Sequence, residues 1–228
     1  MAFNVMKENL LVFGGGPLQL SIINRVKLAG FNAIVIDPDS SARGKEFADI
    51  FKTVSGDDFK TTEKIAKEYD VKGIVTTASD KPILMMCRIA EELGLPFPSY
   101  NSCETLLNKA KFKKFLKENY WPYANGGMYT VPLEIEKLNI KFPVITKPIT
   151  NSGSRGVLKS NNEKELLFAI NETITHSFDG SFLIEEYIEG EEISVEALVQ
   201  YRKVHILQIT DKIVTQPPYN VELGHVQP

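Results

Sequence analysis

The stretch from Pro143 to Val157 constrains the fold of this chain more than any other. It begins with an apolar run that ends in Lys147, passes through a Ser/Gly-rich loop, and becomes strand-like again after Gly156. Two strands joined by such a loop predict a flap. Gly153 and Gly156 can adopt backbone angles that are closed to other residues, so main-chain N–H groups can approach an anion closely.

The loop also carries side-chain donors for the same anion: Ser152, Ser154 and Arg155. Lys147 can place a point charge against a phosphate oxygen, so the pattern predicts a polyphosphate site. A plain Gly/Ser hairpin turn with a surface lysine explains the stretch equally well in isolation. The loop is not a P-loop, because no helix with a Lys-Ser or Lys-Thr pair follows the glycines.

A second stretch, residues 182–195, favours the phosphate interpretation. It predicts a strand, a short acidic hinge and another strand. This arrangement would bring a backbone edge and a carboxylate beside the flap.

Together the two stretches resemble the ATP-grasp superfamily, in the branch of biotin carboxylase, carbamoyl phosphate synthetase and L-amino-acid ligase. The resemblance extends over essentially the whole chain. It implies that Lys147 contacts the α-phosphate region and that the loop from Ser152 to Gly156 covers the β- and γ-phosphates, with Arg155 as a catalytic candidate.

The resemblance also assigns the hinge to the nucleoside. It implies that the backbone of Glu186 and Ile188, with Tyr187 between them, reads adenine, that Glu185 can accept from the adenine amine, and that Glu192 accepts from the ribose hydroxyls. A backbone donor and acceptor suit adenine, and a carboxylate suits a diol.

Two lysines upstream complete the expected phosphate site. ATP-grasp enzymes usually carry a Lys or Arg thirteen residues before a proline, and Lys109 and Pro122 keep that spacing. We therefore expect Lys109 to contact phosphate, with Lys113, one helical turn on, as the alternative. His225 is a catalytic candidate expected in the same cleft as Asp211, Lys212 and Glu222, although a structural His–carboxylate contact explains it equally well.

The first hundred residues alternate between strand and helix patterns, which predicts a parallel sheet with helices on both faces. Gly14-Gly15-Gly16 and Asp37 suggest a dinucleotide site, but Pro17 removes an N–H group and the third glycine of the fingerprint is missing. We expect these glycines to make a tight turn instead. Asp80 and residues 14–19 face the crevice at the strand ends, as substrate contacts or as caps and turns.

We therefore predict an α/β fold: a Rossmann-like domain with a parallel sheet, an α+β ATP-grasp lobe, and the start of a second lobe. The expected boundaries are 1–100, a helical connection at 101–122, the first lobe at 123–188 and the second at 189–228. In finer detail we expect a polar helix at 41–48, a helix capped by Ser102, a linker at 123–129, a helix over 131–141, and Leu167 in the buried stripe of a helix at 162–174.

The resemblance implies an ATP-dependent carboxylate–amine ligase that forms an acylphosphate and then an amide, with amino acids as the expected substrates. Two other classes stay open: a carboxylase or carbamoyl phosphate synthetase relative, and a non-catalytic nucleotide-binding module or dinucleotide-dependent oxidoreductase. Relatives continue for roughly another hundred residues and hold Mg²⁺ there, so we expect an inactive fragment of a longer enzyme without metal ligands of its own.

Composition limits the partners. A net charge of −3 and a pI near 5.7 oppose general binding to nucleic acid or to anionic membranes, which requires a basic field. Cys87 and Cys103 lack metal-ligand spacing and indicate reduced thiols, so we expect a cytoplasmic protein. A homodimer is common among the enzymes that the chain resembles.

Overall fold

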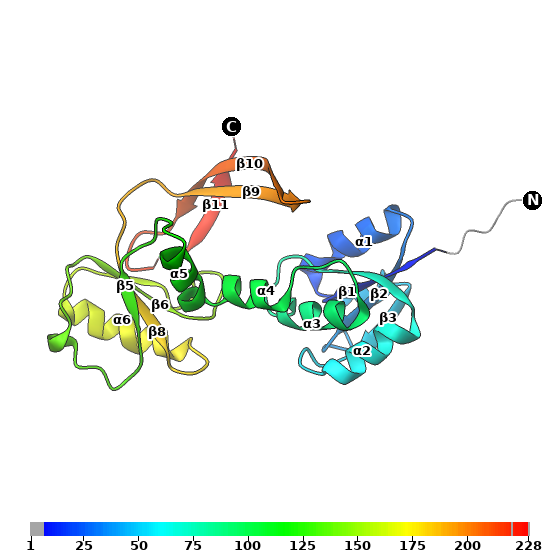
Figure 1. Cartoon of the computed structure of the whole chain (residues 1–228), viewed down its shortest axis with the longest axis horizontal. Coiled ribbons are helices and arrows are strands. Elements are labelled where there is room, and N and C mark those ends of the chain that lie inside the picture. The colour runs from blue at the N-terminus through cyan, green and yellow to red at the C-terminus, as the bar shows by residue number, and fades with distance from the viewer. Residues whose placement is uncertain (1–6, 220, 228) are drawn as a thin grey trace, which may run out of the picture. The chain divides into compact units, whose positions relative to one another are not determined.

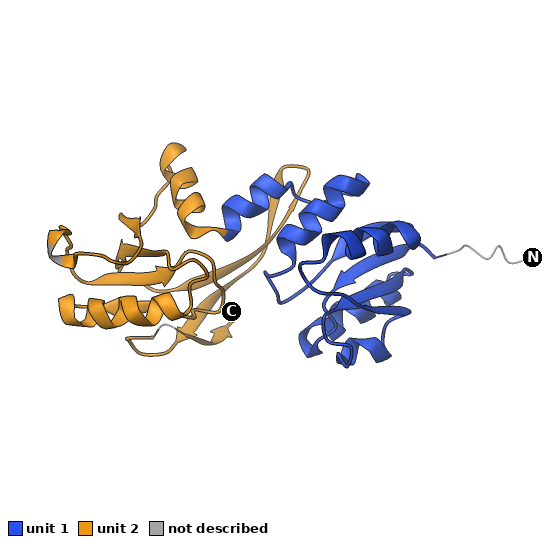
Figure 2. Cartoon of the chain, turned by 90° about the horizontal axis from the view of Figure 1, so that it is seen from below, with its two compact units in different colours: residues 1–107 blue, residues 108–228 orange. Residues whose placement is uncertain are grey.

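The computed structural model describes residues 7–219 and 221–227 and divides into two compact units, residues 1–107 and 108–228 (Figure 2). The predicted α/β fold is confirmed. Its elements are labelled in Figure 1.

The first unit is built on a four-stranded sheet in the order β3-β2-β1-β4, with all pairs parallel. Its elements are β1 Asn9–Phe13, the 3-10 turn Pro17–Gln19, α1 Leu20–Leu28, β2 Asn32–Asp37, the 3-10 turn Arg43–Glu46, β3 Ile50–Thr53, α2 Phe59–Glu68, β4 Val71–Val75, α3 Ile83–Leu93 and α4 Tyr100–Leu107.

Both faces of this sheet are covered, which explains why its strands are continuous apolar runs. Along β1, Leu11 and Phe13 belong to one core cluster with α2 and α3, whereas Val12 packs with Ile23 of α1 on the other face. The alternation follows the period of two of a strand.

The second unit contains two antiparallel sheets, ordered β5-β8-β6-β7 and β11-β10-β9. Its elements are α5 Lys109–Glu118, β5 Gly126–Tyr129, the 3-10 turn Ile135–Lys137, β6 Val144–Pro148, β7 Leu158–Ser160, α6 Glu163–Thr175, β8 Phe182–Glu186, β9 Ile193–Gln200, β10 Lys203–Val214 and β11 Glu222–Val226.

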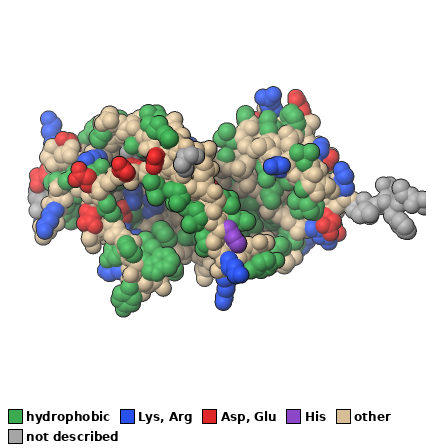
Figure 3. Space-filling view, turned by 90° about the horizontal axis from the view of Figure 1, so that it is seen from above, with side chains coloured by type: hydrophobic (Ala, Val, Ile, Leu, Met, Phe, Trp, Pro, Cys, Tyr) green, Lys and Arg blue, Asp and Glu red, His purple; other side chains and the backbone are tan. Residues whose placement is uncertain are grey.

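The connection between β10 and β11 joins these two sheets. Tyr219 forms a β-bridge with Leu158, and the Lys159 N–H donates to the Pro218 carbonyl at 3.0 Å. Many hydrophobic side chains of β9, β10 and β11 are exposed. Figure 3 shows hydrophobic side chains at the molecular surface.

Two local predictions in the second unit were wrong. The expected linker at 123–129 contains β5, whose glycine permits close strand pairing: a Cβ on Gly126 would lie 2.1 Å from the Ile184 carbonyl oxygen. The expected helix at 131–141 is mostly irregular, because Leu133, Leu138 and Ile140 already pack against the core without a helix.

Three further details of helices differ from expectation. Residues 41–48 contain only a 3-10 turn. The helix predicted to begin after Ser102 begins at Tyr100, and Ser99 accepts from the Ser102 N–H at 3.2 Å. Leu167 is 55 % exposed, because the buried stripe of α6 runs through Leu166, Ala169, Ile170 and Thr173.

Candidate functional site

The charged site of the second unit lies on one face of the sheet β5-β8-β6-β7. Phe182 and Ile184 of β8 pack with α6, so Leu183 and Glu185 point to the opposite face. In the register, Lys147 of β6 pairs with Leu183. Lys147 therefore shares a face with Glu185.

Glu185 is held between two lysines on this face. Its Oε1 lies 2.7 Å from the Lys113 Nζ, and its Oε2 contacts the Lys147 Nζ. The Glu185 side chain is only 7 % exposed, and those of Lys113 and Lys147 are 14 % and 26 % exposed. Lys113 also donates to the Ala124 carbonyl. The three side chains form a largely buried cluster with an excess of one positive charge, which suits an anion.

The helix α5 brings Lys113 to the cluster and fixes Lys109 against the flap. The Asn108 side chain caps this helix by accepting from the Ala110 and Lys111 N–H groups, at 3.1 and 3.0 Å. The Lys109 N–H donates to Ile149, and its ammonium donates to the Asn151 carbonyl at 2.7 Å. Lys109 thus anchors the base of the flap; whether it also contacts phosphate remains a prediction.

The flap has the form that the sequence predicts. Strands β6 and β7 pair antiparallel, and the loop between them has positive φ at Gly153, Ser154 and Gly156, at 68°, 54° and 71°. Such a run of left-handed residues can direct successive N–H groups toward one anion. Ser152 and Arg155 are exposed in the same loop.

Both ends of this loop are anchored at the C-terminal end of α6. The Thr173 hydroxyl donates to the Gly156 carbonyl at 2.9 Å, and the Asn151 side chain donates to His176 at 3.3 Å. A Cβ on Gly156 would lie 3.0 Å from the His176 Cβ, and the φ of 71° is a conformation that side chains with a Cβ rarely adopt, so both favour glycine here. The middle of the loop is left exposed.

The hinge after β8 is fixed by Asn125, a residue that sequence reasoning missed. The Asn125 N–H and side-chain amide both donate to the Glu186 Oε1 at 2.8 Å, and the Glu186 N–H donates back to the Asn125 carbonyl at 2.8 Å. The Tyr187 N–H donates to Pro143, and the Lys159 ammonium lies 3.6 Å from the centroid of the Tyr187 ring. Ile188 follows with an exposed side chain.

A second charged cluster connects the three strands of the other sheet. The Glu192 carboxylate lies 3.2 Å from the Lys212 Nζ, which is 3.7 Å from Glu222. His225 contacts Glu222 through Nε2 at 2.8 Å and the Thr210 hydroxyl through Nδ1 at 2.9 Å. The structure thus brings Glu192, Lys212, Glu222 and His225 together, and His225 makes the His–carboxylate contact left open above.

The sequence of residues 140–228 matches the ATP-grasp domain family. The predicted resemblance to this superfamily is confirmed.

Solved structures show the same fold over nearly the whole chain. L-amino acid ligase from Bacillus licheniformis superimposes with a TM-score of 0.79 at 18 % identity, covering 97 % of this chain and 55 % of that protein. The biotin carboxylase domain of 2-oxoglutarate carboxylase from Hydrogenobacter thermophilus, in complex with MgADP and bicarbonate, gives 0.74 at 24 % identity and covers 94 % and 52 %. Phosphoribosylglycinamide synthetase from Anaerococcus prevotii gives 0.69 at 23 % identity and covers 96 % and 56 %. The chain spans about half the length of these solved proteins.

The donor set of this charged site fits phosphate groups better than a metal ion. Lys113, Lys147 and the loop N–H groups are donors and cations. Among the residues that the structure describes, no group of three or more His, Cys, Asp and Glu side chains is arranged to hold a metal. Across the same residues, no helix is long and apolar enough to cross a membrane.

Proposed function

We propose that this chain carries the ATP-binding part of an ATP-dependent carboxylate–amine ligase. The observation that carries the proposal is the meeting of Lys113 and Lys147 on the buried Glu185, beside the glycine-containing flap. A cationic cluster of low exposure next to flexible backbone donors is suited to a polyphosphate.

In this proposal the flap side of the sheet holds the triphosphate. Lys147 neutralises the α-phosphate region, Lys109 or Lys113 supplies a second cation, and the backbone N–H groups of Ser152 to Gly156 close over the β- and γ-phosphates. Arg155 lies in the exposed middle of the loop and serves as the catalytic cation for the transferred phosphoryl group.

The nucleoside occupies the hinge. The backbone carbonyl of Glu186 and the N–H of Ile188 contact adenine, with Tyr187 beside them, and Glu192 accepts from the ribose. The three hydrogen bonds between Asn125 and Glu186 support this assignment, because they fix the hinge backbone before a ligand arrives.

The reaction is phosphoryl transfer followed by acyl transfer. A substrate carboxylate attacks the γ-phosphorus of ATP, and the bond from this phosphorus to the β–γ bridging oxygen breaks. ADP departs as the leaving group, and the carboxylate becomes an acylphosphate. An amine then attacks the acyl carbon, loses a proton and expels inorganic phosphate, which gives an amide. Both steps depend on positioning and charge neutralisation and need no side-chain nucleophile. Mg²⁺ bound with the nucleotide would add charge neutralisation.

Titration with a fluorescent ATP analogue, competed by unlabelled ATP, tests the nucleotide site. We expect Lys147→Met to weaken binding by at least about tenfold, because a charge-assisted contact is removed. The matched control is Lys114→Met on α5, whose side chain is 75 % exposed and forms an ion pair with Glu118, and it should bind ATP as the unmodified chain does. Circular dichroism verifies that both variants are folded.

Two results would refute the proposal. One is unchanged ATP affinity in a folded Lys147→Met variant. The other is tight NADH binding that ATP does not displace, which would favour a dinucleotide-dependent protein.

A further inference from the structure

Strand β7 carries a third lysine to the face of the sheet that holds Lys113, Lys147 and Glu185. In the register, Lys159 pairs with Ile145, and Ile145 pairs with Glu185. Paired residues of neighbouring strands lie on the same face of a sheet, so Lys159 projects from the same face as the charged cluster. Lys159 is half-buried, and the resemblance assigns no function to it.

The partner of Lys159 is an aromatic ring. Its ammonium group lies 3.6 Å from the centroid of the Tyr187 ring, and a cation is attracted to the face of a ring at distances up to about 6 Å. Within the described part of the chain, Lys159 forms no ion pair that would draw it away from this ring. Tyr187 is also half-buried, so water screens the contact only in part.

Tyr187 occupies the central position of the hinge. It lies between Glu186, whose carbonyl is proposed to accept from adenine, and Ile188, whose N–H is proposed to donate to adenine. Both groups can meet one base only if the Tyr187 backbone keeps a single conformation. The backbone is held by the Tyr187 N–H, which donates to the Pro143 carbonyl at 3.1 Å, and the side chain is held by Lys159.

The strand from which Lys159 projects is bonded on both of its edges. On one edge β7 pairs antiparallel with β6. On the other edge the Lys159 N–H donates to the Pro218 carbonyl at 3.0 Å, and Leu158 forms the β-bridge with Tyr219. The ammonium group therefore extends from a fixed backbone, which makes Lys159 a firm support for the Tyr187 ring.

We infer that Lys159 is a positioning residue that sets the affinity of the site for the adenine base and not for the phosphates. The inference rests on the proposed function, because it requires a nucleotide in this site. Lys159 acts through Tyr187: the contact between cation and ring holds the hinge in the conformation that presents the Glu186 carbonyl and the Ile188 N–H to the base. A hinge that is fixed before binding loses less entropy when the ligand arrives.

Three ligands separate a lysine that acts on the base from one that acts on the phosphates: ATP, adenosine and inorganic tripolyphosphate. Each displaces the fluorescent ATP analogue in a competition titration, after the affinity of the analogue has been measured for every variant. We expect Lys159→Met to weaken ATP and adenosine by the same factor, about fivefold, which is the size of a partly buried cation–ring contact. Tripolyphosphate should bind unchanged. Lys147→Met should show the opposite pattern, with ATP and tripolyphosphate weakened and adenosine retained.

Two further variants assign the effect to the contact itself. Lys159→Arg keeps a cation over the ring and should restore the affinity for adenosine to within about twofold. In Tyr187→Leu the ring is absent, so the addition of Lys159→Met should weaken adenosine no further. A general loss of stability would produce neither result.

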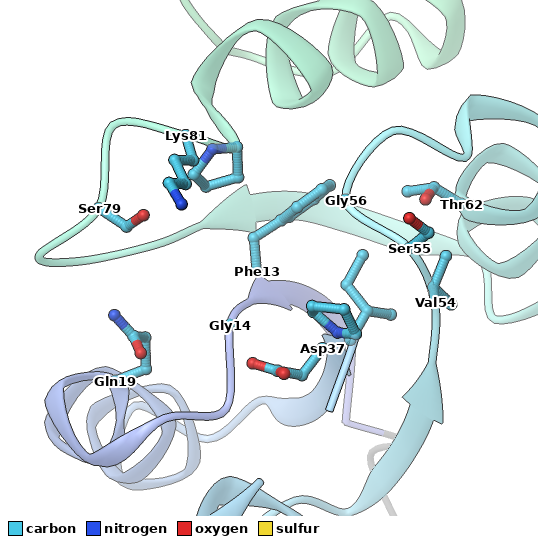
Figure 4. A pocket seen from close by; sticks show the side chains of 13 residues that line it. Phe13, Gly14, Gln19, Asp37, Val54, Ser55, Gly56, Thr62, Ser79 and Lys81 are labelled. Carbon is cyan, nitrogen blue, oxygen red and sulfur yellow. The ribbon is translucent and has the colours of Figure 1, made fainter. Parts of the chain in front are cut away.

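The pocket of the first unit provides the control for the place of binding. It is lined by Phe13, Asp37 and Lys81 among others and has a volume of about 250 Å³ (Figure 4). The Gly15 N–H already donates to the Asp37 carboxylate at 2.7 Å, so the glycine turn beside the pocket is engaged within the protein. Lys81→Met removes the same charge as Lys159→Met does and should leave the affinities for all three ligands unchanged.

The results separate failure of the inference from failure of the proposed function. If the unmodified chain binds neither ATP nor tripolyphosphate, the proposed function is wrong and the inference falls with it. If the unmodified chain binds ATP but Lys159→Met weakens tripolyphosphate as strongly as ATP, the lysine contacts phosphate and the inference alone is wrong. Unchanged ATP affinity in a Lys159→Met variant that circular dichroism shows to be folded, or weaker adenosine binding in Lys81→Met, would also overturn the inference.

Discussion

The substitution Glu185→Gln tests whether the two lysines on β6 and α5 depend on one buried carboxylate. Glutamine keeps the size of the side chain and one carbonyl acceptor but removes the charge. At 2.7 Å, one lysine–carboxylate pair has an attraction of about 6 kcal/mol at an effective dielectric constant near 20. Much of that attraction offsets the desolvation of the three charges, so it is not the net stabilisation.

The expected net effect is a loss of about 3 kcal/mol in the free energy of unfolding. Breaking a buried pair by removing one partner costs roughly 3–5 kcal/mol, because the remaining charge stays buried. Lys113 is 14 % exposed and fits that description, whereas Lys147, at 26 %, can turn partly to solvent. The lower end of the range therefore applies.

Urea unfolding monitored by tryptophan fluorescence measures the free energy of unfolding of the second unit. The chain has one tryptophan, Trp121, which packs edge-to-face on Phe115 at 6.2 Å in the second unit. Glu118→Gln is the matched control: its pair with Lys114 is exposed on the same helix and should change stability by at most about 0.5 kcal/mol. If Glu185→Gln changed stability no more than Glu118→Gln does, the cluster would not be the buried charge centre described above.

Two further predictions concern packing and a buried thiol. Gly126→Ala should destabilise the second unit by at least about 2 kcal/mol in the same urea assay, since the new Cβ would lie 2.1 Å from the Ile184 carbonyl oxygen. The control Gly190→Ala, whose new Cβ would meet nothing within 4 Å, should change the free energy of unfolding by less than about 1 kcal/mol. Equal effects of the two substitutions would contradict the close pairing of β5 with β8. Burial is the largest cause that raises the pKa of the Cys87 thiol from 9.0 to about 12, and the hydrogen bond with Cys103 is the next. Between these two pH values the thiol is protonated in the folded state and ionised in the unfolded state, so the unfolded state binds fewer protons. The free energy of unfolding therefore falls by up to about 1.4 kcal/mol per pH unit as the pH rises. Alkaline denaturation of Cys87→Ala should lack this slope, and an identical slope would refute the assignment.

The first unit could be predicted closely because its strands are buried on both faces. Such strands appear in the sequence as short continuous apolar runs, and the run that ends at Phe13 forms β1. The apolar pattern indicates a strand over 73–77, whereas β4 lies at Val71–Val75. The apolar pattern alone does not determine where β4 begins and ends. Its ends depend on the pairing with β1, which shifts by one residue between Asn9 and Leu10.

The second unit was harder because its irregular segments are ordered by distant partners. Strand β5 contains two glycines, which oppose a strand in isolation, and it forms only because β8 provides a matching edge. Asn125 binds Glu186 across 61 residues of sequence, so no local pattern indicates the contact. Asn108 is different: an asparagine directly before a helix is a favoured cap and could have been recognised.

The charged residues of the site contribute both to the strand pairing of the fold and to the proposed anion binding. The resemblance implies that Lys147 and, as the alternative to Lys109, Lys113 contact the phosphates and that Glu185 contacts adenine, yet in the structure Glu185 pairs with both lysines. Their meeting depends on the register that places Lys147 opposite Leu183. A shift of one residue in β8 would turn Glu185 toward α6 and the Phe182 core, where an unpaired carboxylate costs several kcal/mol. The carboxylate that gathers the two cations for an anion is therefore also a determinant of the sheet register, and a variant that removes it should weaken both.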